Sequence, residues 1–275
     1  MSFGTFLVRH LDRSGQPLTA GVKLIESRYY TGTDFLASAQ GITNDGVCYY
    51  CTGTFVPMKF NGLAKIEMRT GRVVSKKEKY LPEALARQGF NHYGGCTYFE
   101  KKLYVAIEDK NREHPCIGVF DAATLSFTGE YRILGPEIQP DGNLPWCAAD
   151  AENRLLYTGF FDHCDRINQF DADGIRLIKK IPLDRVLEHT QGGEMWDGKI
   201  YVSCHDTWRK KHIYRIDPVT GHVETVMERD ARFNLVESEG ITVCPMPDGS
   251  FFHQLDVIYP LGLAIRRYTA PVADA

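Results

Sequence analysis

The sequence repeats one pattern of short strands and turns five times, at intervals close to 50 residues. When the repeats are aligned on one position of their first strand, that position is occupied by Gly41, Gly94, Trp146, Gly192 and Gly240. The four intervals are 53, 52, 46 and 48 residues. Strand-rich repeats of about 40 to 50 residues are typical of β-propeller blades. The repeat therefore predicts an all-β protein, a five-bladed β-propeller.

Each repeat contains several strand segments that are separated by turns. Asp45-Gly46 and Asp197-Gly198 precede the second strand of their repeats, and Thr220-Gly221 follows a third strand. Asp-Gly and similar Gly-containing turns between alternating strands are strong signals for β-hairpins. We therefore expect four antiparallel strands in each blade.

The last repeat lacks its fourth strand. After Leu261–Tyr268 only seven residues remain, and they are rich in Ala and Pro. Near the N-terminus, Val22–Tyr30 reads as a strand that belongs to no repeat. We predict that this N-terminal strand completes the last blade, which closes the ring and covers edges that would otherwise be exposed. Residues 1–275 are then a single propeller domain.

Composition excludes some classes of partner. The chain has 32 basic and 35 acidic residues, a net charge of −3, which gives no electrostatic reason to expect nucleic acid or an anionic membrane. No apolar run approaches the roughly 20 residues that span a bilayer, and the first residues lack the apolar core of a secretory signal. These features predict a cytoplasmic protein.

Eight cysteines are present, and only Cys48 and Cys51 are close in the sequence. Both lie in one predicted strand at an odd separation, so their side chains should point to opposite faces. We therefore expect reduced, mostly buried thiols in place of a disulfide or zinc site.

Two segments carry a resemblance to a known family. Thr190–Val223 and the pair Ala39–Phe55 and Leu63–Val74 resemble the blades of plant-type glutaminyl cyclotransferases, which are five-bladed propellers. The likeness extends over most of the chain and lies mainly in its turns and strands. That family carries a Gly-Glu-Gly at the head of its second blade, whose glutamate is implicated in catalysis. The corresponding residues here, Tyr93-Gly94-Gly95, contain no carboxylate.

A second, shorter resemblance concerns Ser238–Thr242, with the sequence SEGIT. It is similar to the Glu-Gly opening of the gluconolactonase and strictosidine synthase propellers. In the metal-dependent lactonases of that group the glutamate binds a divalent cation. The resemblance implies the same role for Glu239.

Chemically varied residues gather at one end of the predicted propeller. The loop leading into each first strand and the loop between the second and third strands lie at this end. The first strands and the loops before them supply Gln40, His92, Asn143, Trp146, His189, Gln191, Glu237 and Glu239. The ends of the second strands supply Glu108, Asp109, Asp162, His163, His205, Asp206 and Asp256.

Because the innermost strands of a propeller surround its axis, we expect one residue from several blades to converge there. The predicted ligands of a divalent metal ion are Gln40, His92, His189 and Glu239. Imidazoles with a carboxylate suit zinc, iron or manganese, whereas amide and carboxylate oxygens alone favour calcium or magnesium. The predicted catalytic residues are His92, His205 and Glu239, and the predicted substrate contacts are Trp146, Gln191, Asp162 and Asp206.

A structural role is the alternative for some of these residues. WD-repeat propellers have an aspartate at one repeated blade position, where it holds the blade together by hydrogen bonds. In this sequence four aspartates recur at one blade position in the same way: Asp109, Asp162, Asp206 and Asp256. The residues around the axis differ from blade to blade, which suits a functional site better.

The first functional hypothesis is a small-molecule enzyme, a metal-assisted hydrolase or lyase acting on a lactone, amide or ester. The alternative is a non-catalytic propeller that binds a peptide, a glycan or a protein partner. Glycosidase chemistry needs two carboxylates across a cleft. It ranks third, because the inner ring offers carboxylates from the last blade only.

Overall fold

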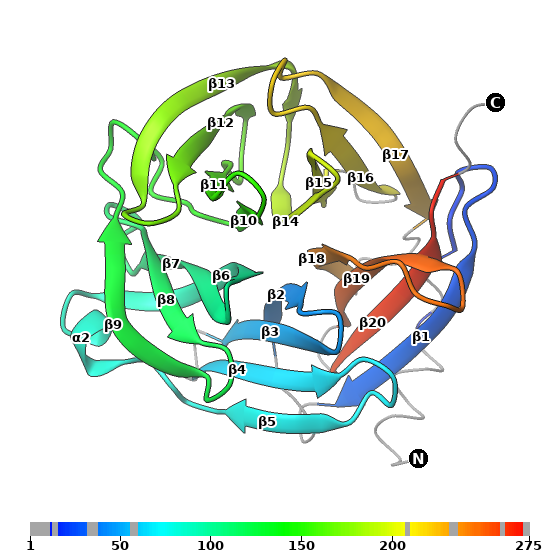
Figure 1. The fold of residues 1–275 in the computed structure, drawn as a ribbon, viewed down its shortest axis with the longest axis horizontal. Helices are drawn as coiled ribbons and strands as arrows, with labels where there is room; N and C mark the ends of the chain where they lie inside the picture. The colour runs from blue at the N-terminus through cyan, green and yellow to red at the C-terminus, as the bar shows by residue number, and fades with distance from the viewer. Residues whose placement is uncertain are drawn as a thin grey trace.

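The computed structural model describes Asp12 and residues 16–31, 38–55, 60–206, 210–230, 236–258 and 262–271. Its strands form five four-stranded antiparallel sheets, which are arranged as a ring around a central axis (Figure 1). The predicted all-β, five-bladed β-propeller is thus confirmed.

The first four blades each contain four consecutive strands, and the first strand of each is innermost. Blade 1 contains β2 (Ala39–Asn44), β3 (Cys48–Phe55), β4 (Phe60–Glu67) and β5 (Val73–Lys77). A single helical turn, α2 (Glu83–Ala86), precedes blade 2, which contains β6 (Phe90–Phe99), β7 (Lys102–Asp109), β8 (Cys116–Asp121) and β9 (Ser126–Ile133). Blade 3 contains β10 (Cys147–Asp150), β11 (Leu155–Thr158), β12 (Cys164–Asp171) and β13 (Arg176–Leu187). Blade 4 contains β14 (Thr190–Trp196), β15 (Lys199–Cys204), β16 (Lys210–Ile216) and β17 (Val223–Asp230).

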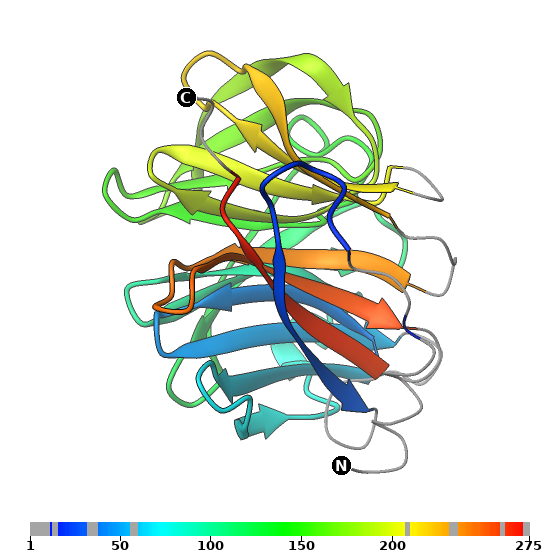
Figure 2. The ribbon, with the colours of Figure 1, turned by 90° about the vertical axis from the view of Figure 1, so that its right-hand side faces the viewer.

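The fifth blade joins the two ends of the chain. It contains β18 (Val236–Val243), β19 (Ser250–Ile258), β20 (Gly262–Thr269) and, as its outermost strand, β1 (Leu24–Thr31). β1 pairs antiparallel with β20 from Leu24↔Tyr268 to Thr31↔Gly262, and Figure 2 shows the two strands side by side. The predicted closure of the last blade by an N-terminal strand is confirmed.

The repeated glycines lie where the innermost strands of neighbouring blades approach each other. A Cβ atom on Gly41 would lie 2.6 Å from the Cα of Gly95, and one on Gly192 would lie 2.7 Å from the Cα of Gly240. A side chain at these positions would clash with backbone, which has little room to move. Close approach at the axis is therefore the physical reason for the repeated glycine.

The two neighbouring cysteines of β3 lie on opposite faces of blade 1, as their separation predicts. Cys48 packs in the core between blades 1 and 2, whereas Cys51 packs in the core between blades 1 and 5. All eight cysteines are free thiols. No helix among the described residues is long and apolar enough to span a membrane.

Candidate active site

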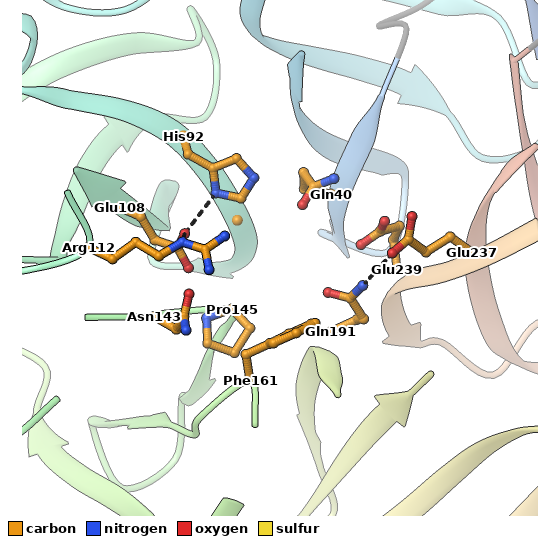
Figure 3. Close-up of a pocket in the computed structure, with 11 residues that line it drawn as sticks. Gln40, His92, Glu108, Arg112, Asn143, Pro145, Phe161, Gln191, Glu237 and Glu239 are labelled. Atoms are coloured by element: carbon orange, nitrogen blue, oxygen red, sulfur yellow. Dashed lines mark hydrogen bonds and ion pairs between the residues drawn. The ribbon is translucent and has the colours of Figure 1, made fainter. Parts of the chain in front are cut away.

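A pocket of about 180 Å³ lies at one end of the propeller axis, and all five blades contribute to it (Figure 3). This is the end predicted from the sequence, since the loop between β7 and β8 and the loop between β11 and β12 both reach it. The lining residues are Gln40, His92, Gly94, Glu108, Arg112, Asn143, Pro145, Phe161, Gln191, Glu237 and Glu239.

Glu239 is the most unusual of these residues because its side chain is almost completely buried. Its residue is 1% exposed, and its Oε2 has no hydrogen-bond partner among the described residues. Burial raises the pKa of this carboxyl well above its ordinary value, and the charges of Glu237 and Asp256 raise it further, against the opposing effect of Lys211. Burial therefore favours the protonated form of Glu239, which is the form that is able to act as an acid.

The opposite side of the pocket holds a pair formed by Glu108 and His92 (Figure 3). Glu108 is buried at the end of β7, and its Oε1 accepts a hydrogen bond from the backbone N–H of Leu144 at 2.9 Å. Its Oε2 lies 3.2 Å from Nδ1 of His92 and 3.9 Å from Nε of Arg112. The Nδ1 atom of His92 is close to the carboxylate but is not aligned for a hydrogen bond. Catalytic hydrogen bonds are often poorly aligned before a substrate is bound.

Glutamine side chains complete the wall next to Glu239. Nε2 of Gln191 donates to Oε1 of Glu237 at 3.3 Å. Nε2 of Gln40 lies 3.5 Å from Oγ of Ser38 and from the carbonyl oxygen of Ala39. Both amide nitrogens thus contact protein atoms, and the two amide oxygens face the pocket (Figure 3).

The structure brings four of the predicted site residues into the pocket: Gln40, His92, Gln191 and Glu239. The other five lie outside its lining, and two of these, His189 and Asp162, contact each other. His189 has a side chain that is 46% exposed, with Nε2 3.2 Å from Oδ1 of Asp162, and its ring centre is 5.2 Å from that of Phe161. His189 and Asp162 therefore form an exposed pair close to the pocket residue Phe161.

Trp146 does not contact the pocket, which corrects its prediction as a substrate contact. It is completely buried, its Nε1 donates to Oγ1 of Thr190 at 2.8 Å, and a Cβ atom on Gly193 would lie 2.5 Å from its ring. Trp146 fills the space between blades 3 and 4.

Asp206 also lies within blade 4 and does not line the pocket. Its carboxylate accepts hydrogen bonds at 2.7 Å from Nδ1 of His212 and from the hydroxyl of Tyr214. These contacts support the structural alternative for Asp206, and its role as a substrate contact stays a prediction.

His205, predicted to be catalytic, is absent from the pocket lining as well. Burial lowers the pKa of its imidazole to about 4, and the charges of Lys211 and His189 lower it further. The ring is therefore neutral at pH 7. Its Nδ1 is buried and has no hydrogen-bond partner among the described residues.

The four predicted metal ligands do not converge. His189 lies outside the pocket lining, and the described residues contain no group of three or more His, Cys, Asp or Glu side chains that could hold a metal ion. In addition, burial disfavours the ionised form of Glu239, which is the form that a metal ion would need as a ligand. The residues present do not fit the predicted site, so the divalent metal ion stays a prediction and no step below depends on it.

Several pocket residues were not selected from the sequence. Glu108 and Glu237 stood among the varied residues of the correct end, but Arg112, Pro145 and Phe161 gave no signal of their own. The one feature of the sequence that indicated a place for Glu108 in the pocket was its position at the end of a second strand. Its presence corrects the premise that the carboxylates near the axis come from the last blade only.

No family model matches the chain, and no curated protein sequence matches it. Among solved structures it is similar to an exo-beta-1,3-galactanase from Phanerochaete chrysosporium, with a TM-score of 0.55 and 10% identity over 87% of this chain and 64% of that chain. It also matches a luciferin-regenerating enzyme, with a TM-score of 0.47 and 9% identity over 89% of this chain and 96% of that chain.

A third match is Kuenenia stuttgartiensis hydrazine synthase, with a TM-score of 0.45 and 13% identity over 80% of this chain; the match spans 56% of that chain. At these identities the likeness to the galactanase supports the propeller fold alone. The resemblance to plant-type glutaminyl cyclotransferases stays a prediction.

Proposed function

We propose that the protein is an enzyme that acts on a small molecule in the axial pocket by acid–base catalysis. The observation that carries this proposal is the buried carboxyl of Glu239, which faces the Glu108–His92 pair across the pocket and whose Oε2 has no hydrogen-bond partner among the described residues. A carboxyl whose protonated form is favoured by burial, facing an imidazole across one pocket, is a usual arrangement for a general acid and a general base.

The reaction that fits best is hydrolysis of an ester, lactone or amide. His92 accepts a proton from water, and the resulting hydroxide equivalent forms a bond to the carbonyl carbon. Glu239 transfers its proton to the leaving oxygen or nitrogen as the bond to the carbonyl carbon breaks. The proton on His92 then returns to Glu239 through solvent, so that no proton is gained or lost.

A lyase reaction would use the same two residues. His92 would take a proton from carbon, and Glu239 would protonate the group that leaves from the neighbouring carbon. Glu108 has a positioning role in both reactions, because its carboxylate contacts Nδ1 of His92 and stabilises the positive charge that the imidazole gains.

The test is turnover of a panel of small esters, lactones and amides by the wild-type protein and two variants. General acid–base catalysis contributes about 10²- to 10⁴-fold to rate, so Glu239→Gln and His92→Gln should each lower kcat by about that factor. Glu130→Gln, at a side chain that is 62% exposed, is the matched control and should leave kcat unchanged. Wild-type kcat in Glu239→Gln would contradict the assignment.

A second candidate function is glycoside hydrolysis. It is favoured by the specific observation that carboxyl groups from blades 2 and 5, Glu108 and Glu239, line one pocket from two sides. Glycosidases require such a pair, one as acid and one as base or nucleophile. A panel of aryl glycosides distinguishes the two candidates, and binding of ligands from either panel without turnover would support the non-catalytic alternative.

A further inference from the structure

The two sides of the pocket differ in their hydrogen-bonding chemistry. Arg112 and His92 lie on one side, next to Glu108. The opposite side, which we call the acceptor wall, consists of Gln40, Gln191, Glu237 and Glu239 (Figure 3).

The contacts of the two glutamines determine what the acceptor wall presents. Nε2 of Gln191 donates to Glu237, and Nε2 of Gln40 is directed to Ser38 and Ala39. Each amide therefore uses its donor group within the protein and presents its oxygen to the pocket. Glu237 adds a carboxylate whose Oε1 receives a long bond of 3.3 Å. The lining residues of this wall include no lysine or arginine, although the buried Lys211 interacts electrostatically with Glu237.

Glu239 supplies an independent sign that a ligand belongs here. Its Oε2 is buried without a partner among the described residues, and it lies in the lining of the pocket. A buried polar atom that lacks a hydrogen bond destabilises the folded protein. A bound group that donates a hydrogen bond to this oxygen would remove that destabilising effect.

We propose that the acceptor wall binds a primary ammonium group of the substrate. A protonated amine carries three N–H donors and one positive charge, which match several oxygen acceptors and the charge of Glu237. A hydroxyl group brings one donor and no charge, so it leaves most of these acceptors unpaired. The proposal rests on the proposed function, since it names the substrate class of the same pocket: an ester, lactone, amide or glycoside that bears an amine.

A divalent metal ion would also bind to oxygen atoms, but this wall suits it less. Burial disfavours the ionised form of Glu239, so Glu237 would be the main anionic ligand on this wall. Uptake of a metal ion in place of the amine is therefore an outcome that the experiment must detect.

The experiment measures binding by calorimetry for pairs of ligands that differ in one group: glucosamine and glucose, cyclohexylamine and cyclohexanol, ethanolamine and ethylene glycol. At least one amine should bind about tenfold or more tightly than its alcohol partner, as expected for hydrogen bonds to a charged group. This preference should weaken as salt is raised, because the charges of the pocket rim are partly screened.

Glu237→Gln keeps the shape of the side chain and removes its charge, so it should abolish the preference for amines. Glu108→Gln, which removes a carboxylate from the other wall, is the matched control and should retain it. Gln40→Met, which removes one oxygen, should reduce amine affinity by a smaller factor and serves as a second test if Glu237→Gln does not fold.

The proposal is overturned if alcohols bind as tightly as their amine partners, or if no ligand of either kind binds at millimolar concentration. It is also overturned if Ca²⁺, Mg²⁺, Mn²⁺ or Zn²⁺ binds stoichiometrically and displaces the amines in wild type but not in Glu237→Gln. Amine binding with the expected response to Glu237→Gln, but with no turnover of any substrate, would refute the enzymatic proposal and leave the ammonium site standing.

Discussion

Glu194, a second buried glutamate near the axis, should make the stability of the propeller depend on pH. Its Oε2 accepts hydrogen bonds from the hydroxyls of Thr43 and Thr242, each at 3.0 Å. Those two hydroxyl oxygens in turn accept from the backbone N–H of Tyr98 at 3.0 Å and from Nδ2 of Asn44 at 2.7 Å. Glu194 thus connects blade 4 with blades 1 and 5, and through Thr43 with blade 2.

Burial raises the pKa of Glu194 from 4.5 to about 8, although the threonine hydrogen bonds lower it. Between these two values the unfolded chain is ionised while the folded protein keeps the proton. The folded state then binds more protons, so the free energy of unfolding falls as pH rises, by about 1.4 kcal/mol for each pH unit. Over the whole interval the free energy of unfolding falls by at most about 5 kcal/mol. This figure is an upper limit, because residual structure in the unfolded chain makes the difference between the two states smaller.

The assay is urea unfolding of the wild-type protein and Glu194→Gln between pH 5 and pH 9. The Gln variant does not titrate at this position and keeps an oxygen for both threonine hydroxyls. The wild type should therefore lose stability relative to the variant, mainly between pH 5 and pH 8. Glu130→Gln, an exposed control, should follow the wild type. Parallel stability curves for the wild type and Glu194→Gln would refute the argument.

Three further outcomes are expected. Deletion of residues 1–30 removes most of β1 and leaves the outer edge of β20 unpaired, so circular dichroism should show loss of the cooperative thermal transition; an unchanged transition would contradict the closure. Asp206→Ala leaves the hydroxyl of Tyr214 and Nδ1 of His212 without their acceptor and should lower the free energy of unfolding by about 1–3 kcal/mol, measured in urea, while ligand binding is retained. Alkylation under denaturing, non-reducing conditions should label all eight cysteines, and a mass lower by two hydrogens would reveal a disulfide.

The two buried glutamates show how a structural and a functional carboxyl differ. Both have a raised pKa because of burial. Glu194 has hydrogen-bond donors directed at it from neighbouring blades, whereas Oε2 of Glu239 has none among the described residues and faces a pocket. Unsatisfied buried groups are costly, so they concentrate where a ligand will satisfy them.

The architecture was predictable from the sequence because it depends on local and repeated signals. Asp-Gly turns define hairpins, and the spacing of Gly41, Gly94, Gly192 and Gly240 defines the blades. The missing fourth strand of the last repeat indicated that an N-terminal strand completes it. These predictions do not depend on which side chains contact each other. Strand pairing and the close packing of the inner strands follow from the repeat of about 50 residues.

The sequence also identified the end of the propeller that carries the pocket, together with Gln40, His92, Gln191 and Glu239. The sequence did not show which residues at these blade positions line the pocket and which lie in the protein interior. Trp146 and Asp206 have the right chemistry for substrate contacts, but each is directed into the protein interior. A shift of strand register by one residue turns a side chain from the pocket to the interior. No local pattern in the sequence distinguishes these two directions.

The five blades, their closure and the end at which varied chemistry gathers could thus be inferred from the amino-acid sequence. The contact across the pocket could not, because Glu108 of blade 2 and Glu239 of blade 5 are 131 positions apart in the chain and face each other only in the folded ring. The same holds for the surroundings of the two buried glutamates: Oε2 of Glu194 accepts two hydrogen bonds, whereas Oε2 of Glu239 has no partner among the described residues. The physical reason is that the pKa and reactivity of a carboxyl depend on burial and on neighbours from other blades, which exist only once the ring has closed.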